Sequence, residues 1–109
     1  MRPDLPSRFV SKIITSDTTL TTHDIALYGL FVASTAGVAI TLPIPHEAMN
    51  GAESLIVNHS ASTISVNCLN GFANSLDSIT LAAGASILLY CAEVSGNTYR
   101  WAVVGATPS

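Results

Sequence analysis

Three histidines and seven acidic residues are the side chains in this sequence that could hold a metal ion. His23 stands beside Asp24, His46 stands beside Glu47, and His59 is alone. Zinc sites in small domains contain two Cys or two His residues a few positions apart, and no such pair occurs here. The two His–acid pairs lie near turns or strand ends, where polar residues are expected in any case. The sequence therefore predicts no metal site and no cofactor.

Nucleophilic catalysis is the second chemistry that the residue types allow, because serines are abundant and Asp17, Asp24 and Asp77 could serve in a triad. A catalytic serine needs a positioned base and commonly a Gly-x-Ser-x-Gly turn, and that motif is absent from the sequence. The acids are too scattered to suggest the paired carboxylates of glycoside cleavage, and there is no Gly-rich phosphate loop. The sequence predicts that the protein is not an enzyme.

The aromatic residues could form a platform for a sugar ring. The chain has only one Trp and three Tyr, and Trp101 lies in a segment of alternating polarity, Tyr99 to Val103. An alternating segment places every second side chain in the core. A core position is therefore favoured for Trp101.

Cys68 and Cys91 lie in apolar, strand-like segments. The amino terminus lacks the apolar stretch of a secretory signal, so synthesis and retention in a cytoplasm are expected. A reducing compartment leaves thiols unpaired. Free, buried thiols are expected, and a disulfide is the alternative.

Charge is scarce: charged residues make up 10% of the chain, with a net charge of −3, where soluble proteins have about 25%. A weakly acidic chain without a basic stripe has no electrostatic attraction to phosphate, so nucleic-acid binding is excluded. Ile25 to Pro45 lacks charges and is long enough to cross a bilayer, but Gly29, Pro43 and Pro45 argue against a membrane span. A charge-poor surface suits a protein that is packed against others.

The elements that must position these residues are short strands. Period-two alternation predicts strands over Gly37 to Leu42, Thr63 to Cys68 and Ser78 to Ala82. Apolar runs at Ile25 to Ala33 and Ser86 to Ala92 predict strands that lie centrally or press a second face, including Leu30, Val32, Leu88 and Tyr90, against a neighbouring subunit. One helical turn is allowed at His46 to Asn50.

Turn residues separate these runs, which gives about eight strands in one domain. The predicted fold is an all-β, single-domain antiparallel β-sandwich or small barrel, jelly-roll-like, over residues 9–105. Residues 1–8 form an extended N-terminal arm because Pro3 and Pro6 oppose a helix, and residues 106–109 form a short tail. Three of the four basic residues lie in the first twelve positions, which makes the arm locally positive.

Five segments of the sequence resemble the β modules of tailed-bacteriophage virion proteins. The resemblance covers roughly residues 20–105, and its segments are Gly37-Val-Ala-Ile-Thr-Leu-Pro43, Gly51-Ala-Glu-Ser-Leu-Ile-Val-Asn58, Ser62-Thr-Ile-Ser-Val-Asn67, Ser78-Ile-Thr-Leu-Ala-Ala-Gly84 and Tyr99-Arg-Trp-Ala-Val-Val-Gly105. The apolar run at Ile87 to Cys91 departs from the pattern of that group, which has a more polar strand there. The resemblance implies a non-enzymatic structural role in a symmetric oligomer.

Two functions follow as expectations. The first is a capsid decoration, or cement, protein that binds the major capsid protein on the outer capsid surface, stabilises the shell and forms a homo-oligomer, with a trimer preferred and a dimer possible. The partner-binding residues would then lie in the arm: Arg2, Pro3, Leu5, Pro6, Arg8 and Phe9. The alternative is a tail-fibre or baseplate module that binds a host receptor or glycan through an exposed aromatic or polar groove.

Overall fold

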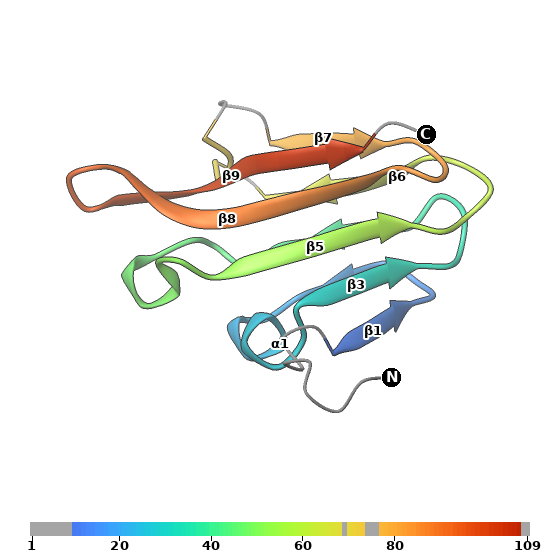
Figure 1. Ribbon diagram of the computed structural model, residues 1–109, viewed down its shortest axis with the longest axis horizontal. Coiled ribbons are helices and arrows are strands. Elements are labelled where there is room, and N and C mark those ends of the chain that lie inside the picture. Colours follow the sequence, from blue (N-terminus) through green and yellow to red (C-terminus); the bar gives the residue numbers. More distant parts are fainter. Residues whose placement is uncertain (1–9, 69, 74–76, 108–109) are drawn as a thin grey trace, which may run out of the picture.

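Two β-sheets stacked face to face make up the structure (Figure 1). The computed structural model describes residues 10–68, 70–73 and 77–107. One sheet has five strands in the order β1-β3-β5-β8-β9, and the other has four in the order β2-β4-β6-β7. The strands of the five-stranded sheet are β1 (Ser11–Ile14), β3 (Leu30–Ala33), β5 (Glu53–Asn58), β8 (Ser86–Ser95) and β9 (Thr98–Thr107). Those of the four-stranded sheet are β2 (Thr18–Thr19), β4 (Ala39–Thr41), β6 (Ile64–Asn67) and β7 (Ser78–Leu81).

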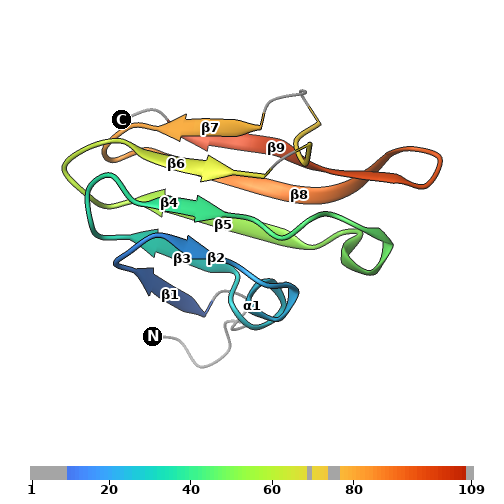
Figure 2. The same cartoon turned by 180° about the vertical axis from the view of Figure 1, so that it is seen from behind.

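The first six strands alternate between the two sheets as the chain proceeds (Figure 2). Each strand therefore returns to its sheet in the same direction, and β1, β3 and β5 pair in parallel, as do β2, β4 and β6. The pairs β5–β8, β6–β7 and β8–β9 are antiparallel.

The predicted all-β sandwich is confirmed, and its predicted antiparallel, jelly-roll-like pairing is wrong for β1 to β6. Two strands that are joined by a reversal of the chain within one sheet pair antiparallel. From β1 to β6, each connection between neighbours instead runs through one strand of the opposite sheet, so the chain returns in its original direction. At the other end of the chain, β9 continues to Thr107 because its last residues pair with Ser86 and Ile87 of β8, so residues 106 and 107 belong to a strand and not to a tail.

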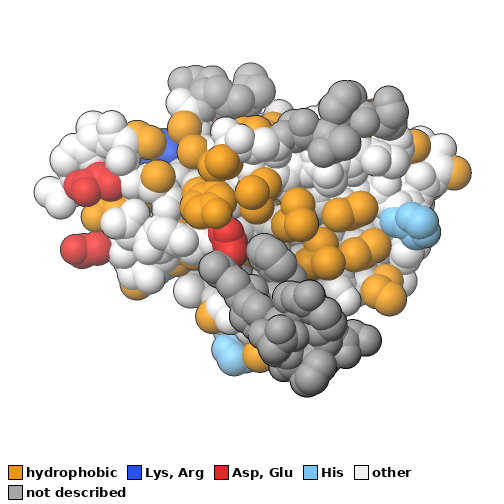
Figure 3. Space-filling view, in the orientation of Figure 1, with side chains coloured by type: hydrophobic (Ala, Val, Ile, Leu, Met, Phe, Trp, Pro, Cys, Tyr) orange, Lys and Arg blue, Asp and Glu red, His pale blue; other side chains and the backbone are white. Residues whose placement is uncertain are grey.

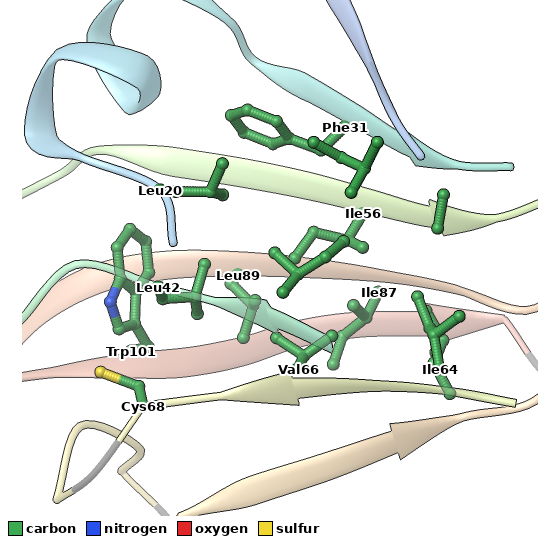
Figure 4. Close-up of a cluster of buried hydrophobic side chains, with 14 of the residues drawn as sticks. Leu20, Phe31, Leu42, Ile56, Ile64, Val66, Cys68, Ile87, Leu89 and Trp101 are labelled. Atoms are coloured by element: carbon green, nitrogen blue, oxygen red, sulfur yellow. The ribbon is translucent and has the colours of Figure 1, made fainter. Parts of the chain in front are cut away.

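The core lies between the sheets and is built from the alternation seen in the sequence (Figure 4). Most positions that the alternation predicts to face inward are buried: Val38, Ile40, Leu42, Ile64, Val66, Cys68, Ile87, Leu89 and Cys91. Ile79 and Tyr99 are only partly buried, and Val103 is 43% exposed. Trp101 is 0% exposed, and its indole Nε1 donates a hydrogen bond to the Pro43 carbonyl oxygen, 2.9 Å away. The prediction of a core role for Trp101 is confirmed.

The predicted strand at Ile25 to Ala33 is wrong in its first half, which belongs to the helix α1 (Thr22–Leu27). Thr21 caps this helix: its side chain accepts a hydrogen bond from the Asp24 backbone N–H, and the Asp24 carboxylate accepts one from the Thr21 backbone N–H. Such a reciprocal capping box starts a helix even where the apolar pattern reads as a strand. Among the described residues, no helix is long and apolar enough to span a membrane. The turn allowed at His46 to Asn50 is present as the 3₁₀ helix η1 (Glu47–Met49).

Asn58 fixes the connection between β5 and β6 and is fully buried. Its side-chain Nδ2 donates to the carbonyl oxygens of Ser62 and Leu81, at 2.8 and 2.9 Å. Its Oδ1 accepts from the backbone N–H and the hydroxyl of Ser60. A buried amide with all of its hydrogen-bonding groups in use ties the two sheets together at this crossing.

Candidate interaction surface

Apolar side chains gather on the outward face of the five-stranded sheet, with an acidic side chain among them (Figure 3). The strand register arranges the apolar side chains in cross-strand rows. Ile13, Val32 and Val57 occupy one row, and Leu30, Leu55 and Leu88 the next. Ile13 is 65% exposed, and the others are half-buried. We call this surface the apolar outer face and define it by Ile13, Leu30, Val32, Leu55, Val57, Leu88, Tyr90 and Ala102. A sheet that is apolar on both sides is typical of one whose second side is covered by a partner.

Charged groups lie at one end of this face. Glu53 stands opposite Tyr90 in the β5–β8 ladder. Arg100 stands opposite Ala92, close to the β8–β9 turn. Over β1, β3, β5 and β8, the rows that contain Leu55 and Val57 carry only apolar and serine side chains, so a partner could cover this part without desolvating an ion.

The outward face of the four-stranded sheet has the opposite character. Thr19, Thr41, Asn67 and Ser78 form one row across its four strands. The Ser78 hydroxyl donates to Asn67 Oδ1 over 2.6 Å. Hydroxyl and amide side chains form hydrogen bonds with water, so this face is compatible with exposure to solvent. The two outer faces thus differ in polarity, one apolar and the other polar.

The arm residues predicted to bind a partner, Arg2, Pro3, Leu5, Pro6, Arg8 and Phe9, lie outside the described residues. The three histidines are exposed and come from separate places: His23 from α1, His46 before η1, and His59 after β5. In the described part of the chain, no three His, Cys, Asp or Glu side chains gather as a metal site would require.

Both cysteines are buried and carry free thiols. Cys68 Sγ lies 3.6 Å from the Pro43 carbonyl oxygen, and Cys91 Sγ lies 4.0 Å from the His46 carbonyl oxygen. Burial raises the pKa of the Cys68 thiol and of the Cys91 thiol. A thiol with a raised pKa stays protonated at neutral pH and is a poor nucleophile, so these two act as small apolar core residues.

A polar hollow of about 330 Å³ lies at the β8–β9 turn, between residues 45–47 and 97–100. Its lining includes His46, Glu47, Asn97, Tyr99 and Arg100. Burial, followed by the negative charges of Glu93 and Glu47, raises the pKa of the Tyr99 hydroxyl. The hollow offers hydrogen-bond donors and acceptors, together with the Tyr99 side chain, to a small polar ligand. A second hollow, about 280 Å³, lies between α1 and η1 and is lined largely by small residues and Met49.

Sequence reasoning found part of the apolar outer face and missed the rest. Leu30, Val32, Leu88 and Tyr90 were predicted as a second apolar side, and the structure places them together on it. Leu55 and Val57 were missed as surface residues, although the run Leu55-Ile-Val57 could have signalled a strand with two apolar sides.

The fold thus defines the class of protein: it is a sandwich of two mixed sheets, with one apolar and one polar outer face. No protein-family model matches the chain, and no curated protein matches it. A solved structure similar to it is the crystal structure of residues 132–251 of StcE from enterohemorrhagic E. coli, with a TM-score of 0.51 and 17% sequence identity. The match covers 93% of this chain and 94% of that one. At this identity the likeness concerns the fold alone.

Proposed function

We propose that this chain is a non-enzymatic structural protein of a bacterial-virus particle, a capsid decoration protein that binds the outer capsid surface as a homo-oligomer and stabilises the shell. It would be made in the host cytoplasm and end on the virion. The apolar outer face is the observation that carries the proposal. The resemblance of five sequence segments to phage virion modules supplies the capsid as the target.

The physical basis is burial of apolar area. Removing apolar surface from water contributes about 25 cal/mol per Å², and the rows around Leu55 can be covered without burying a charge. A protein that binds only the assembled shell also shifts the assembly equilibrium toward that shell by mass action. The polar row of Thr19, Thr41, Asn67 and Ser78 would then face the solvent.

The direct test is to mix the purified protein with undecorated capsids and image them by cryo-electron microscopy. Leu55→Lys places a charge in the middle of the apolar outer face and should abolish decoration, whereas Thr41→Lys, on the polar face, should leave it intact. Comparing the two variants separates disruption of the apolar outer face from a general effect of adding a positive charge. Equal decoration by both variants would contradict the assignment of this face.

Deleting residues 1–9 tests the arm. If the arm residues Arg2 to Phe9 reach neighbouring capsid subunits, the shortened protein keeps its oligomeric state in sedimentation velocity but no longer attaches. An arm-deleted protein that decorates shells at full occupancy would show that these residues are not needed for attachment.

A second candidate function is a tail-fibre or baseplate module that binds a host receptor or glycan. The hollow beside Tyr99 and Arg100 favours it, because sugar sites combine an aromatic edge with charged hydrogen-bonding groups. Screening the protein on a glycan array, with Arg100→Ala as the comparison, tests this function. Glycan binding that needs Arg100, without capsid binding, would replace the first proposal by the second.

A further inference from the structure

Both sheets end at the same edge of the sandwich, one with β9 and the other with β7 (Figures 1 and 2). At the opposite edge lie β1 and β2. We call the first of these the β7/β9 edge and define it by Ser78–Leu81 and residues 103–107.

The hydrogen bonds of Trp101 show which backbone groups of β9 point toward this edge. The Trp101 backbone N–H donates to the Gly71 carbonyl oxygen over 2.6 Å, and the Trp101 carbonyl oxygen accepts from the Ala73 N–H over 3.0 Å, so both groups point away from β8. In an antiparallel ladder such outward groups recur at every second residue. Val103, two residues on in the same register with β8, therefore presents its N–H and carbonyl to the same side. Among the described residues, the backbone bonds on this side of β9 end at Trp101.

The hydrophobic layer between the sheets also opens at this edge. Register places Val103 on the same side of β9 as the buried Trp101, yet Val103 is 43% exposed. Ile79 of β7 packs against the core and is only partly buried. A bulge at Val104, which is 60% exposed, interrupts the regular strand geometry of β9 at this edge. Because the regular part of β9 is short here, β7 must contribute to any contact made at this edge.

The two edges differ in how they resist pairing with another strand. Natural sheets protect their edges with charges, prolines, bulges or very short strands. β1 carries Lys12, and β2 is only two residues long. β7 has no charged residue, and neither has β9 after Arg100. Apart from the bulge, the described part of the β7/β9 edge carries none of these devices.

We infer that the β7/β9 edge is an interface between two copies of this chain, related by a twofold axis normal to the sheets. Such an axis sets β9 antiparallel to the partner's β9 and β7 antiparallel to the partner's β7, so both layers continue into the second copy. A single extended peptide could pair with only one of the two edge strands, whereas a second copy of the sandwich pairs with both. The exposed Val103 side chains would meet between the layers and extend the core. This inference rests on the proposed homo-oligomer, but not on the capsid as its target.

Sedimentation velocity of the full chain over a range of concentrations tests the interface. The wild-type protein should form dimers. Val103→Pro removes the outward N–H, which an edge strand tolerates, and should weaken dimerisation on the order of 100-fold. Val103→Lys sets like charges together at the axis and should act similarly, so it decides the question if the proline variant does not fold. Thr19→Lys adds the same charge to the edge strand β2 at the opposite edge, on the polar face, and should leave the dimer intact.

A monomer at every concentration, or an oligomer that persists in both Val103 variants, would overturn the inference. Capsid binding is measured separately with the Leu55→Lys and Thr41→Lys pair. A dimer that depends on Val103 in a protein that never binds capsids would refute the proposed function and leave the interface standing. Capsid binding by a wild-type monomer would refute the interface and leave the proposed attachment to capsids standing.

Discussion

The buried side chain of Asn58 makes four hydrogen bonds: three hold the loop after β5, and the one to the Leu81 carbonyl oxygen reaches the other sheet. Asn58→Ala removes the donors to the Ser62 and Leu81 carbonyls and leaves buried polar groups without partners, which costs about 2 to 3 kcal/mol of the free energy of unfolding. Urea unfolding followed by circular dichroism measures the loss. Asn67→Ala, on the polar outer face, is the control and should cost less than about 1 kcal/mol. Equal losses in the two variants would show that burial of Asn58 contributes nothing special.

The buried thiols predict a pH dependence of stability. Because burial raises the pKa of Cys68 and of Cys91 in the folded protein above that of a free thiol, folding favours the protonated thiols. Their contribution is fully present below the pKa of the unfolded chain, about 8.5, and is lost as the pH rises through the folded values. The urea concentration at the midpoint of unfolding should therefore decrease as the pH is raised from about 8 to about 10, because this range begins near the unfolded-state pKa of about 8.5.

The control for this effect is a double variant, Cys68→Ala with Cys91→Ala, which should show a flatter profile over the same range. Ellman's reagent gives a second measurement, since both thiols are inaccessible in the folded protein. Their reaction should require unfolding, and rapid reaction of native protein would contradict the burial of the thiols.

At the scale of elements, the short helix α1 depends on its cap. Thr21 and Asp24 satisfy each other's backbone N–H groups, and the helix has only six residues. Isolated helices of this length are unstable, so the cap and the burial of Ile25 must hold it. Thr21→Ala should cost about 1 kcal/mol, measured by thermal unfolding. Thr63→Ala, at an exposed position without a cap, is the matched control, and a similar loss there would argue against the capping contribution.

The sequence predicted most strands but not how they pair. Alternation at Val38, Ile40 and Leu42, and at Ile64, Val66 and Cys68, identified inward faces that the structure confirms. Period-two patterning looks the same in parallel and antiparallel strands, because each strand's alternation reflects only its own two sides. The direction of pairing depends on whether the chain turns back or crosses to the other sheet, which residues around Pro43 and Asn50 do not encode.

The apolar outer face was predicted only in part for a related reason. Leu30 and Leu88 belong to long apolar runs that reveal a second apolar side. Ile13 and Val57 join them only through the register of β1 with β3 and of β3 with β5. A surface assembled from five separated strands becomes visible in the sequence only once their register is known.

For the whole molecule, the character of the apolar outer face predicts how attachment depends on salt. Sodium chloride screens ionic contacts, whereas sulfate strengthens the burial of apolar surface. Binding of the protein to capsids through the rows around Leu55 should hold or increase in sodium sulfate and change little in sodium chloride. Quantifying bound protein by sedimentation of shells at each salt concentration makes the measurement. A steep loss in sodium chloride would mean that ionic contacts dominate attachment.

The alternating path of the first six strands has a consequence for synthesis on the ribosome. β5 lies beside β8, and β6 beside β7, so a nascent chain that has emerged only as far as β6 has neither of its sheets closed on that side. Pairs such as Leu30 with Leu55 also require long loops to close before any contact is gained. Release from a premature stop codon before β8 would leave β5 without its neighbour and the core uncovered. Such fragments should be substrates for chaperones and proteases, and productive folding waits for the final hairpin.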